Sequence, residues 1–235
     1  MRRMRAAALA SFVCLVSSPV ASADRPPFSV VDQPSQDGRC IDDTGAGDLD
    51  RSETACLAQI RDVAQRNGSG LKLAFRNGRT RIYRNQDAKC ADGDAKGCVK
   101  FQLTGYFTDH DLILLECGRL EGVDWLLVRA DTGDEIGIVA PPHYSPEKRW
   151  LVSVASHQGP AGPPDGIDVI PAKRDRTIKD WHYRTPDDGK WRYEFERWDG
   201  EDQIVISAKS IGDTASPRSI AVYRKKNEWL FKEPR

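Results

Sequence analysis

Apolar and polar residues alternate along much of the chain beyond Gly70, a pattern typical of half-buried β-strands. In "LKLAFRNGRTRIYRN", residues 71–85, the alternation runs up to Asn77-Gly78 and resumes after it. Asn-Gly is a strong hairpin turn signal because both residues tolerate positive φ. The pattern predicts a β-hairpin over residues 71–84 and β structure from there on.

Three later stretches share one order of residue types: an aromatic residue, four or five polar or turn-forming residues, and a strand-like run. They are "FTDHDLILLEC" from Phe107, "YSPEKRWLVSVA" from Tyr144 and "WDGEDQIVISAK" from Trp198. Each is followed by a second strand pattern ("DWLLVR", "IDVIPA", "SIAVYR"), a polar turn and a third ("EIGIV", "TIKDWHY", "EWLFKE"). The hairpin at 71–84 matches the last two strands of this unit. The sequence therefore predicts three repeats plus a partial fourth.

The middle unit departs from the others at its start. Only "APPH" separates the third strand of the preceding unit from Tyr144. We expect any strand before this aromatic residue to be short or absent.

The stretch "YSPEKRWLVSV" resembles the Ser-Pro-Asp-Gly strand motif of TolB-type and WD40-like β-propeller blades, with Glu147-Lys148 in place of Asp-Gly. The resemblance covers about residues 101–231 and implies a small propeller-like array of antiparallel blades, each stacking on its neighbours. A β-sandwich with a similar number of strands is the alternative. In either case large rings fill the space between sheets, as we expect for Trp125, Trp150, Trp181, Trp191, Trp198 and Trp229.

One helix is predicted, within "DRSETACLAQIRDVAQRNGSG", residues 50–70. Its apolar residues recur at spacings of three and four: Cys56, Ile60, Val63 and Ala64. Asp50 with Glu53 three residues later suits a helix start, and Asn67-Gly68 suits a helix end.

The N-terminus has the features of a secretory signal peptide. Three arginines precede an apolar run too short to cross a bilayer, and Ala21-Ser22-Ala23 fits signal peptidase. We expect residues 1–23 to be removed after Ala23, residues 24–70 to form a segment with a disulfide-tied helix, and residues 71–235 to form the β domain. The expected location is periplasmic or secreted.

The predicted mature chain has little net charge. Loss of three arginines leaves 32 basic against 35 acidic side chains, a formal charge of about −3. This balance argues against a general nucleic-acid binder, and no later apolar stretch approaches the length of a membrane span. An envelope or periplasmic protein is the expected kind of partner.

Five cysteines remain in the mature chain, where an oxidising compartment favours pairing. We predict two local disulfides, Cys40 with Cys56 and Cys90 with Cys98. Cys117 ends the apolar run "LILLEC" and is predicted to be a buried free thiol.

The usual signatures of catalysis and metal binding are absent from the sequence. "CADGDAKGC" lacks the downstream ligands of a calcium loop and the partners of a zinc site. The four histidines form no pair at metal-binding spacing, and no G-x-S-x-G, H-E-x-x-H or G-x-G-x-x-G motif occurs. We predict no catalytic residue, metal or cofactor. Turn chemistry accounts for the acidic residues Asp131, Asp134, Asp165, Asp168, Asp187 and Asp188.

The loop "SHQGPAGPPDG", residues 156–166, is rich in Pro and Gly and is the candidate contact loop, with His157, Gln158 and Asp165 as its contact residues. The sequence therefore favours an exported, non-enzymatic binding or protein-interaction module. The alternatives are a hydrolase-like enzyme with its site at the centre of the blades and an envelope structural protein.

Overall fold

The computed structural model describes residues 49–120, 122–155, 165–173, 180–185, 190–211 and 216–232. These residues form two helices and fifteen strands, so the predicted mainly β class is confirmed. Residues 1–48 lie outside the described part, and the predicted signal peptide stays a prediction. No described helix is long and apolar enough to span a bilayer.

The strands form four antiparallel sheets in which neighbouring strands follow one another along the chain. Sheet 1 contains β1 (Ala64–Asn67), β2 (Gly70–Ala74) and β3 (Thr80–Arg84). Sheet 2 contains β4 (Lys100–Phe107), β5 (Leu112–Gly118), β6 (Val123–Arg129) and β7 (Glu135–Ile138). Sheet 3 contains β8 (His143–Tyr144), β9 (Trp150–Ala155), β10 (Gly166–Pro171) and β11 (Trp181–Arg184). Sheet 4 contains β12 (Trp191–Trp198), β13 (Gln203–Ser210), β14 (Arg218–Lys225) and β15 (Glu228–Phe231).

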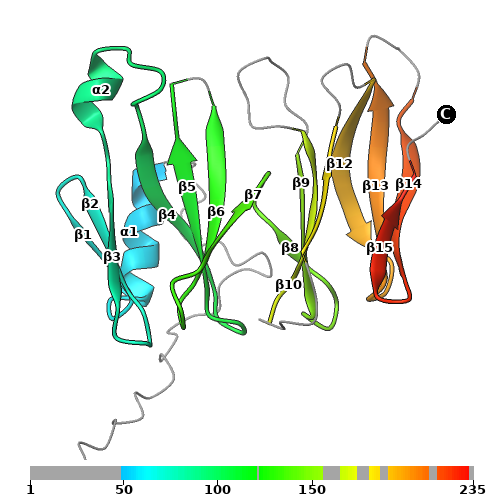
Figure 1. Ribbon diagram of the computed structural model, residues 1–235, viewed down its shortest axis with the longest axis horizontal. Coiled ribbons are helices and arrows are strands. Elements are labelled where there is room, and N and C mark those ends of the chain that lie inside the picture. The colour runs from blue at the N-terminus through cyan, green and yellow to red at the C-terminus, as the bar shows by residue number, and fades with distance from the viewer. Residues whose placement is uncertain are drawn as a thin grey trace, which may run out of the picture.

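The four sheets are stacked in a row, in the order of the chain (Figure 1). Successive side chains of a strand point to opposite faces, so one strand supplies two cores. In β5, Ile113 and Leu115 pack toward sheet 1, whereas Leu112 and Leu114 pack toward sheet 3. A further core, rich in aromatic rings, joins sheets 3 and 4. Face-to-face packing of antiparallel sheets is common to propeller-like arrays and sandwiches, so both architectures remain predictions.

All six tryptophans lie in strands. Trp150 of β9 and Trp229 of β15 are buried between sheets 3 and 4, with ring centroids 5.3 Å apart in an edge-to-face arrangement. Aromatic pairs in this geometry contribute about 0.5–1.5 kcal/mol beyond the area they bury.

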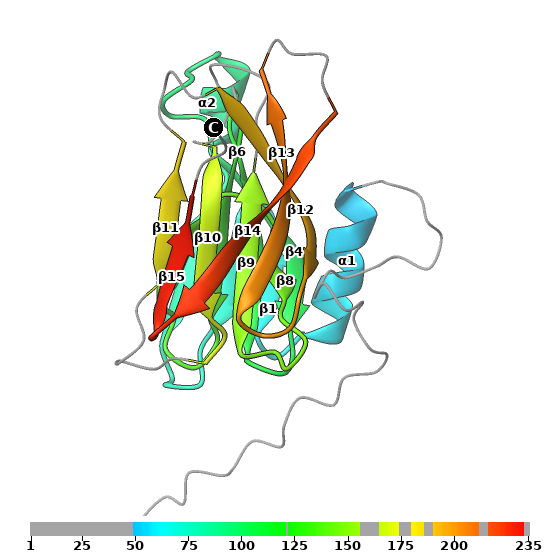
Figure 2. The same cartoon turned by 90° about the vertical axis from the view of Figure 1, so that its right-hand side faces the viewer.

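Helix α1 (Leu49–Gln59) packs against β4 and β1 (Figure 2). The four predicted core positions, Cys56, Ile60, Val63 and Ala64, are buried as expected.

The predicted C-terminal end of this helix was wrong. Residues 64–67 form β1, which pairs with β2, and Gly68 at φ +55° belongs to the turn between them. Long-range contacts explain the difference, since Arg66 donates to the Phe101 carbonyl (2.7 Å) and to Glu53. Pairing with β2 outweighs the weak helical preference of this segment.

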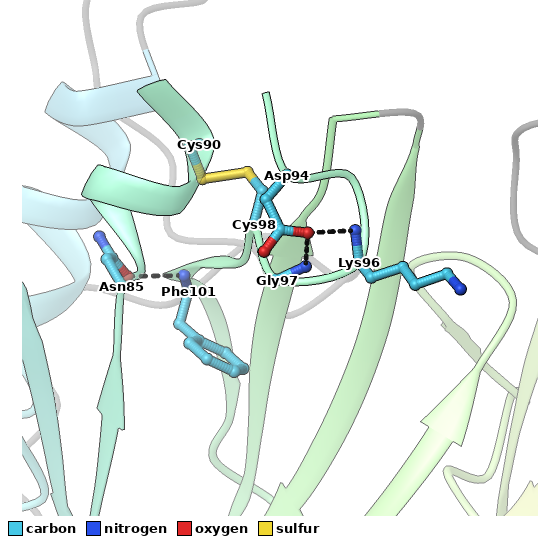
Figure 3. Close-up of a disulfide and its surroundings, with 7 residues drawn as sticks. All are labelled: Asn85, Cys90, Asp94, Lys96, Gly97, Cys98 and Phe101. Carbon is cyan, nitrogen blue, oxygen red and sulfur yellow. Dashed lines mark hydrogen bonds between the residues drawn. A yellow bond between two sulfur atoms is a disulfide. The ribbon is translucent and has the colours of Figure 1, made fainter. Parts of the chain in front are cut away.

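The Cys90–Cys98 disulfide is present and closes the loop between β3 and β4 (Figure 3). This loop contains a short helix, α2 (Asp87–Ala91), which the sequence pattern did not predict. Asp94 accepts hydrogen bonds from the backbone N–H groups of Lys96 (3.2 Å) and Gly97 (2.9 Å), a turn role for this acidic side chain.

Of the predictions for the other cysteines, the structure tests the one for Cys117 and does not test the Cys40–Cys56 pair. Cys117 is a free cysteine and is buried, as predicted. Burial raises the pKa of its thiol to about 12. Cys56 lies in the core, but Cys40 is outside the described residues, so their pairing stays a prediction.

Candidate functional site

One end of the interface between sheets 2 and 3 contains an apolar cluster that includes Leu112, Leu151 and Ile170. There the Lys148 ammonium pairs with Asp109, which brings the β8–β9 and β4–β5 turns together. The buried Arg129 side chain donates to the carbonyls of Ala172 (3.1 Å) and Pro171 (3.2 Å) at the same end. Since β5 and β9 both start here, their last residues meet at the opposite end of the interface.

That opposite end is polar. Strand alternation and the pairing registers place nine residues there, on the faces of the two sheets that are turned toward each other. We call this group the polar end: Gln102, Glu116 and Trp125 of sheet 2, and Ser153, Ala155, Gly166, Asp168, His182 and Arg184 of sheet 3.

The chain crosses between the two sheets just beneath the polar end, from β7 to β8. Asp168 Oδ2 accepts the Val139 N–H (2.9 Å). Ser153 Oγ accepts the Ala140 N–H (2.7 Å) and donates to the Ala140 carbonyl (2.6 Å). These side chains therefore provide hydrogen-bond partners for backbone groups of Val139 and Ala140, which precede the short strand β8. The two-residue length of β8 confirms the short strand predicted before Tyr144.

Asp168 is completely buried at the centre of the polar end. Its Oδ1 accepts hydrogen bonds from His182 Nδ1 (2.7 Å) and Arg184 Nη1 (2.5 Å). The attribution of Asp168 to turn chemistry was wrong, because this residue lies within β10 opposite His182. A buried carboxylate needs both counter-charge and hydrogen bonds, and this one has both.

His182 and Arg184 extend from the buried carboxylate to the surface, with 41% and 38% of their side chains exposed. The hydrogen bond from Asp168 raises the pKa of His182, while partial burial acts in the opposite direction. Because Nδ1 faces Asp168, the remaining ring nitrogen, Nε2, is left for other contacts.

Gly166 provides the space that Arg184 needs to reach Asp168. A Cβ atom at this position would lie 2.4 Å from the Tyr183 carbonyl oxygen and 3.1 Å from Arg184 Nη1. Glycine is therefore required by a close approach of the neighbouring strand, a recurrent reason for glycine within a sheet.

Glu116 is the half-buried acidic residue on the sheet 2 side of the polar end. It lies between Gln102 and Trp125 on the neighbouring strands. Its carboxyl has no hydrogen-bond or ion-pair partner among the described residues, and burial raises its pKa. A partly desolvated carboxyl without a partner is a candidate for ligand contact.

The predicted contact loop is rooted at the polar end. It leaves the sheet after Ala155 and returns at Gly166, two residues that are paired across β9 and β10. The Asp165 carbonyl accepts the Thr185 N–H (2.9 Å). His157 and Gln158 lie outside the described residues, so their contact roles stay predictions.

Sequence reasoning missed the functional potential of Glu116, His182 and Arg184. The sequence signal that could have indicated these residues is a single polar residue within an apolar strand pattern, such as Glu116 in "LILLEC". Their juxtaposition depends on strand register, which the pattern does not give. In the described part of the chain, no three His, Cys, Asp or Glu side chains are grouped to hold a metal ion.

Comparison with known proteins adds no relative. No family model, curated protein or solved structure matches this chain.

Proposed function

We propose that this protein is an exported binding module that engages its partner through the polar end of the sheet 2–sheet 3 interface. The observation that carries the proposal is the Glu116 carboxyl, which is half-buried and lacks a partner among the described residues. Glu116 lies near the end of β5, at the same end of the interface as Ala155 and Gly166, where the contact loop begins and ends. The expected partner is a periplasmic or envelope protein.

The sheets suit this role because they fix the site before a partner arrives. Asp168 and Ser153 hold the crossing segment, and Asp168 also orients His182 and Arg184. Preorganised side chains lose little conformational entropy on binding, which favours affinity.

The test is capture of a partner by immobilised mature protein from a periplasmic extract of the source cells. We expect a protein that is retained by the unmodified chain, lost with Glu116→Gln and kept with Glu194→Gln. Glu194 is exposed on β12 and provides the same chemical change away from the polar end. Capture that is equal for both variants would contradict the proposal.

A second candidate function is hydrolysis, favoured by the Asp168–His182 pair. A carboxylate on Nδ1 orients a histidine so that Nε2 can act as a general base. Assay of the purified protein on ester and glycan substrates tests this candidate. Turnover that is lost in His182→Gln would support it, whereas turnover unchanged in that variant would exclude His182 as the base.

A further inference from the structure

We infer that the polar end binds a primary ammonium group, as presented by a lysine side chain of the partner, with Glu116 as counter-ion and the Trp125 ring beside it. This inference rests on the proposed function and specifies the chemistry of the ligand.

Glu116 is the acidic side chain of the polar end that has no ion-pair partner among the described residues. Asp168 pairs with both Arg184 (2.5 Å) and His182 (2.7 Å) within sheet 3. At the adjacent end of sheet 2, Arg119 pairs with Asp124 (2.5 Å). Glu116 is paired across the strands with Trp125 on one side and with Gln102 on the other, and Gln102 carries no charge.

Lys100 is the nearest basic residue on the same face of sheet 2. It pairs with Gly118 and so lies diagonal to Glu116. Lys100 is exposed and forms no ion pair with Glu116 in the described structure. Because Lys100 is solvated and does not pair with Glu116, the partly desolvated Glu116 carboxylate can pair with a cation of the ligand.

Trp125 supplies the second element of ammonium recognition. It lies directly opposite Glu116 on β6, a position at which Cβ atoms are about 4.5–5.5 Å apart. An ammonium group over an indole ring gains electrostatic attraction from the ring quadrupole. Carboxylate and indole thus lie on one face of sheet 2, within reach of a single cation.

The facing part of sheet 3 contains two small residues besides His182 and Arg184. Ala155 and Gly166 form a cross-strand pair there, and they begin and end the contact loop. The Arg184 side chain fills the space beside Gly166 and turns its guanidinium group toward Asp168, not toward Glu116.

Other ligand chemistries fit the polar end less well. An anion would be repelled by Glu116 once this residue is ionised. A neutral hydroxyl would leave its charge uncompensated, and burial already raises the pKa of this carboxyl. An ammonium group offers three donors and the missing charge.

The experiment titrates the mature protein with Nα-acetyl-lysine N-methylamide and follows the Trp125 indole N–H and the Glu116 carboxyl by NMR. Nα-acetyl-norleucine N-methylamide is the matched probe without the ammonium group. We expect a saturable shift of both signals with the lysine probe only. Glu116→Gln should weaken the affinity at least tenfold, and Glu194→Gln should leave it within twofold. Thermal unfolding of each variant verifies that it is folded.

The outcomes separate this inference from the proposed function. Equal binding of the two probes, no binding of the lysine probe, or binding unaffected by Glu116→Gln would overturn the ammonium site. If Glu116→Gln nevertheless abolishes capture of the partner, the proposed function stands with a different ligand chemistry. If capture is also unaffected, both fail.

Discussion

His182 Nδ1 lies 2.7 Å from Asp168 Oδ1, so the edge strand β11 is tied to a completely buried carboxylate of β10. The same carboxylate holds the Val139 N–H through its other oxygen. One side chain therefore connects the outer strand of sheet 3 with the segment that enters this sheet from sheet 2.

Asp168→Asn should destabilise the fold by about 1–3 kcal/mol, because one buried acceptor oxygen for Val139, His182 and Arg184 is replaced by an NH₂ group. Urea unfolding of the mature protein measures the loss. Asp124→Asn is the matched control, since Asp124 pairs with Arg119 at the surface, where such pairs contribute about 0–1 kcal/mol. Equal effects of the two substitutions would contradict the structural role of Asp168.

His182 should make stability depend on pH. Its pKa is raised in the folded protein above the ordinary value of about 6.5, chiefly by the hydrogen bond to Asp168, while Arg184 opposes and Asp180 supports the shift. Protonated His182 thus stabilises the folded state fully below the unfolded pKa, and this contribution is lost as pH rises through the folded pKa.

The measurement compares unfolding free energies of the unmodified chain and His182→Gln between pH 5 and 9, a range of about 1.5 units below and about 2.5 units above the ordinary histidine pKa. The difference between the two proteins should shrink toward high pH. A difference that is constant or grows with pH would refute the assignment.

Glu201→Gln should destabilise the turn that follows Tyr144. The nearly buried Glu201 carboxylate accepts hydrogen bonds from Ser145 Oγ (2.5 Å) and from the backbone N–H groups of Glu147 (2.9 Å) and Arg149 (3.2 Å). Replacing one carboxylate oxygen by NH₂ removes acceptors from these donors, at a cost of about 1–3 kcal/mol.

Chemical denaturation checks this value, with Glu147→Gln as control. Glu147 contacts Arg149 at 3.1 Å with 67% of its side chain exposed, so its loss should change stability by less than about 1 kcal/mol. If the control costs as much as Glu201→Gln, the turn does not depend on the contact between sheets 3 and 4.

Thiol titration should give one reactive cysteine in the unfolded, unreduced mature protein. Cys90 and Cys98 are joined, Cys117 is free, and Cys40 is predicted to pair with Cys56. In the folded protein Cys117 should react slowly, because it is buried and its pKa is raised to about 12. Three reactive thiols after unfolding would show that one predicted disulfide does not form.

The strand positions were accessible from the sequence because alternation and turn residues are local signals. Val123–Arg129 and Glu228–Phe231 differ by few residues from the predicted "DWLLVR" and "EWLFKE". The segment Ala64–Asn67 was not accessible, because it becomes a strand only by pairing with β2. A local pattern cannot reveal a partner that folds against it from elsewhere.

The sequence by itself determined the β class, the short entry strand before Tyr144, the Cys90–Cys98 disulfide and the burial of Cys117, since each follows from neighbouring residues. The tertiary structure alone decided that Glu116 and Trp125 lie side by side on the face of sheet 2 that is turned toward sheet 3, and that Asp168 joins Val139 to His182. The physical reason is that register and sheet stacking place these residues together, and both depend on side chains far apart in the chain.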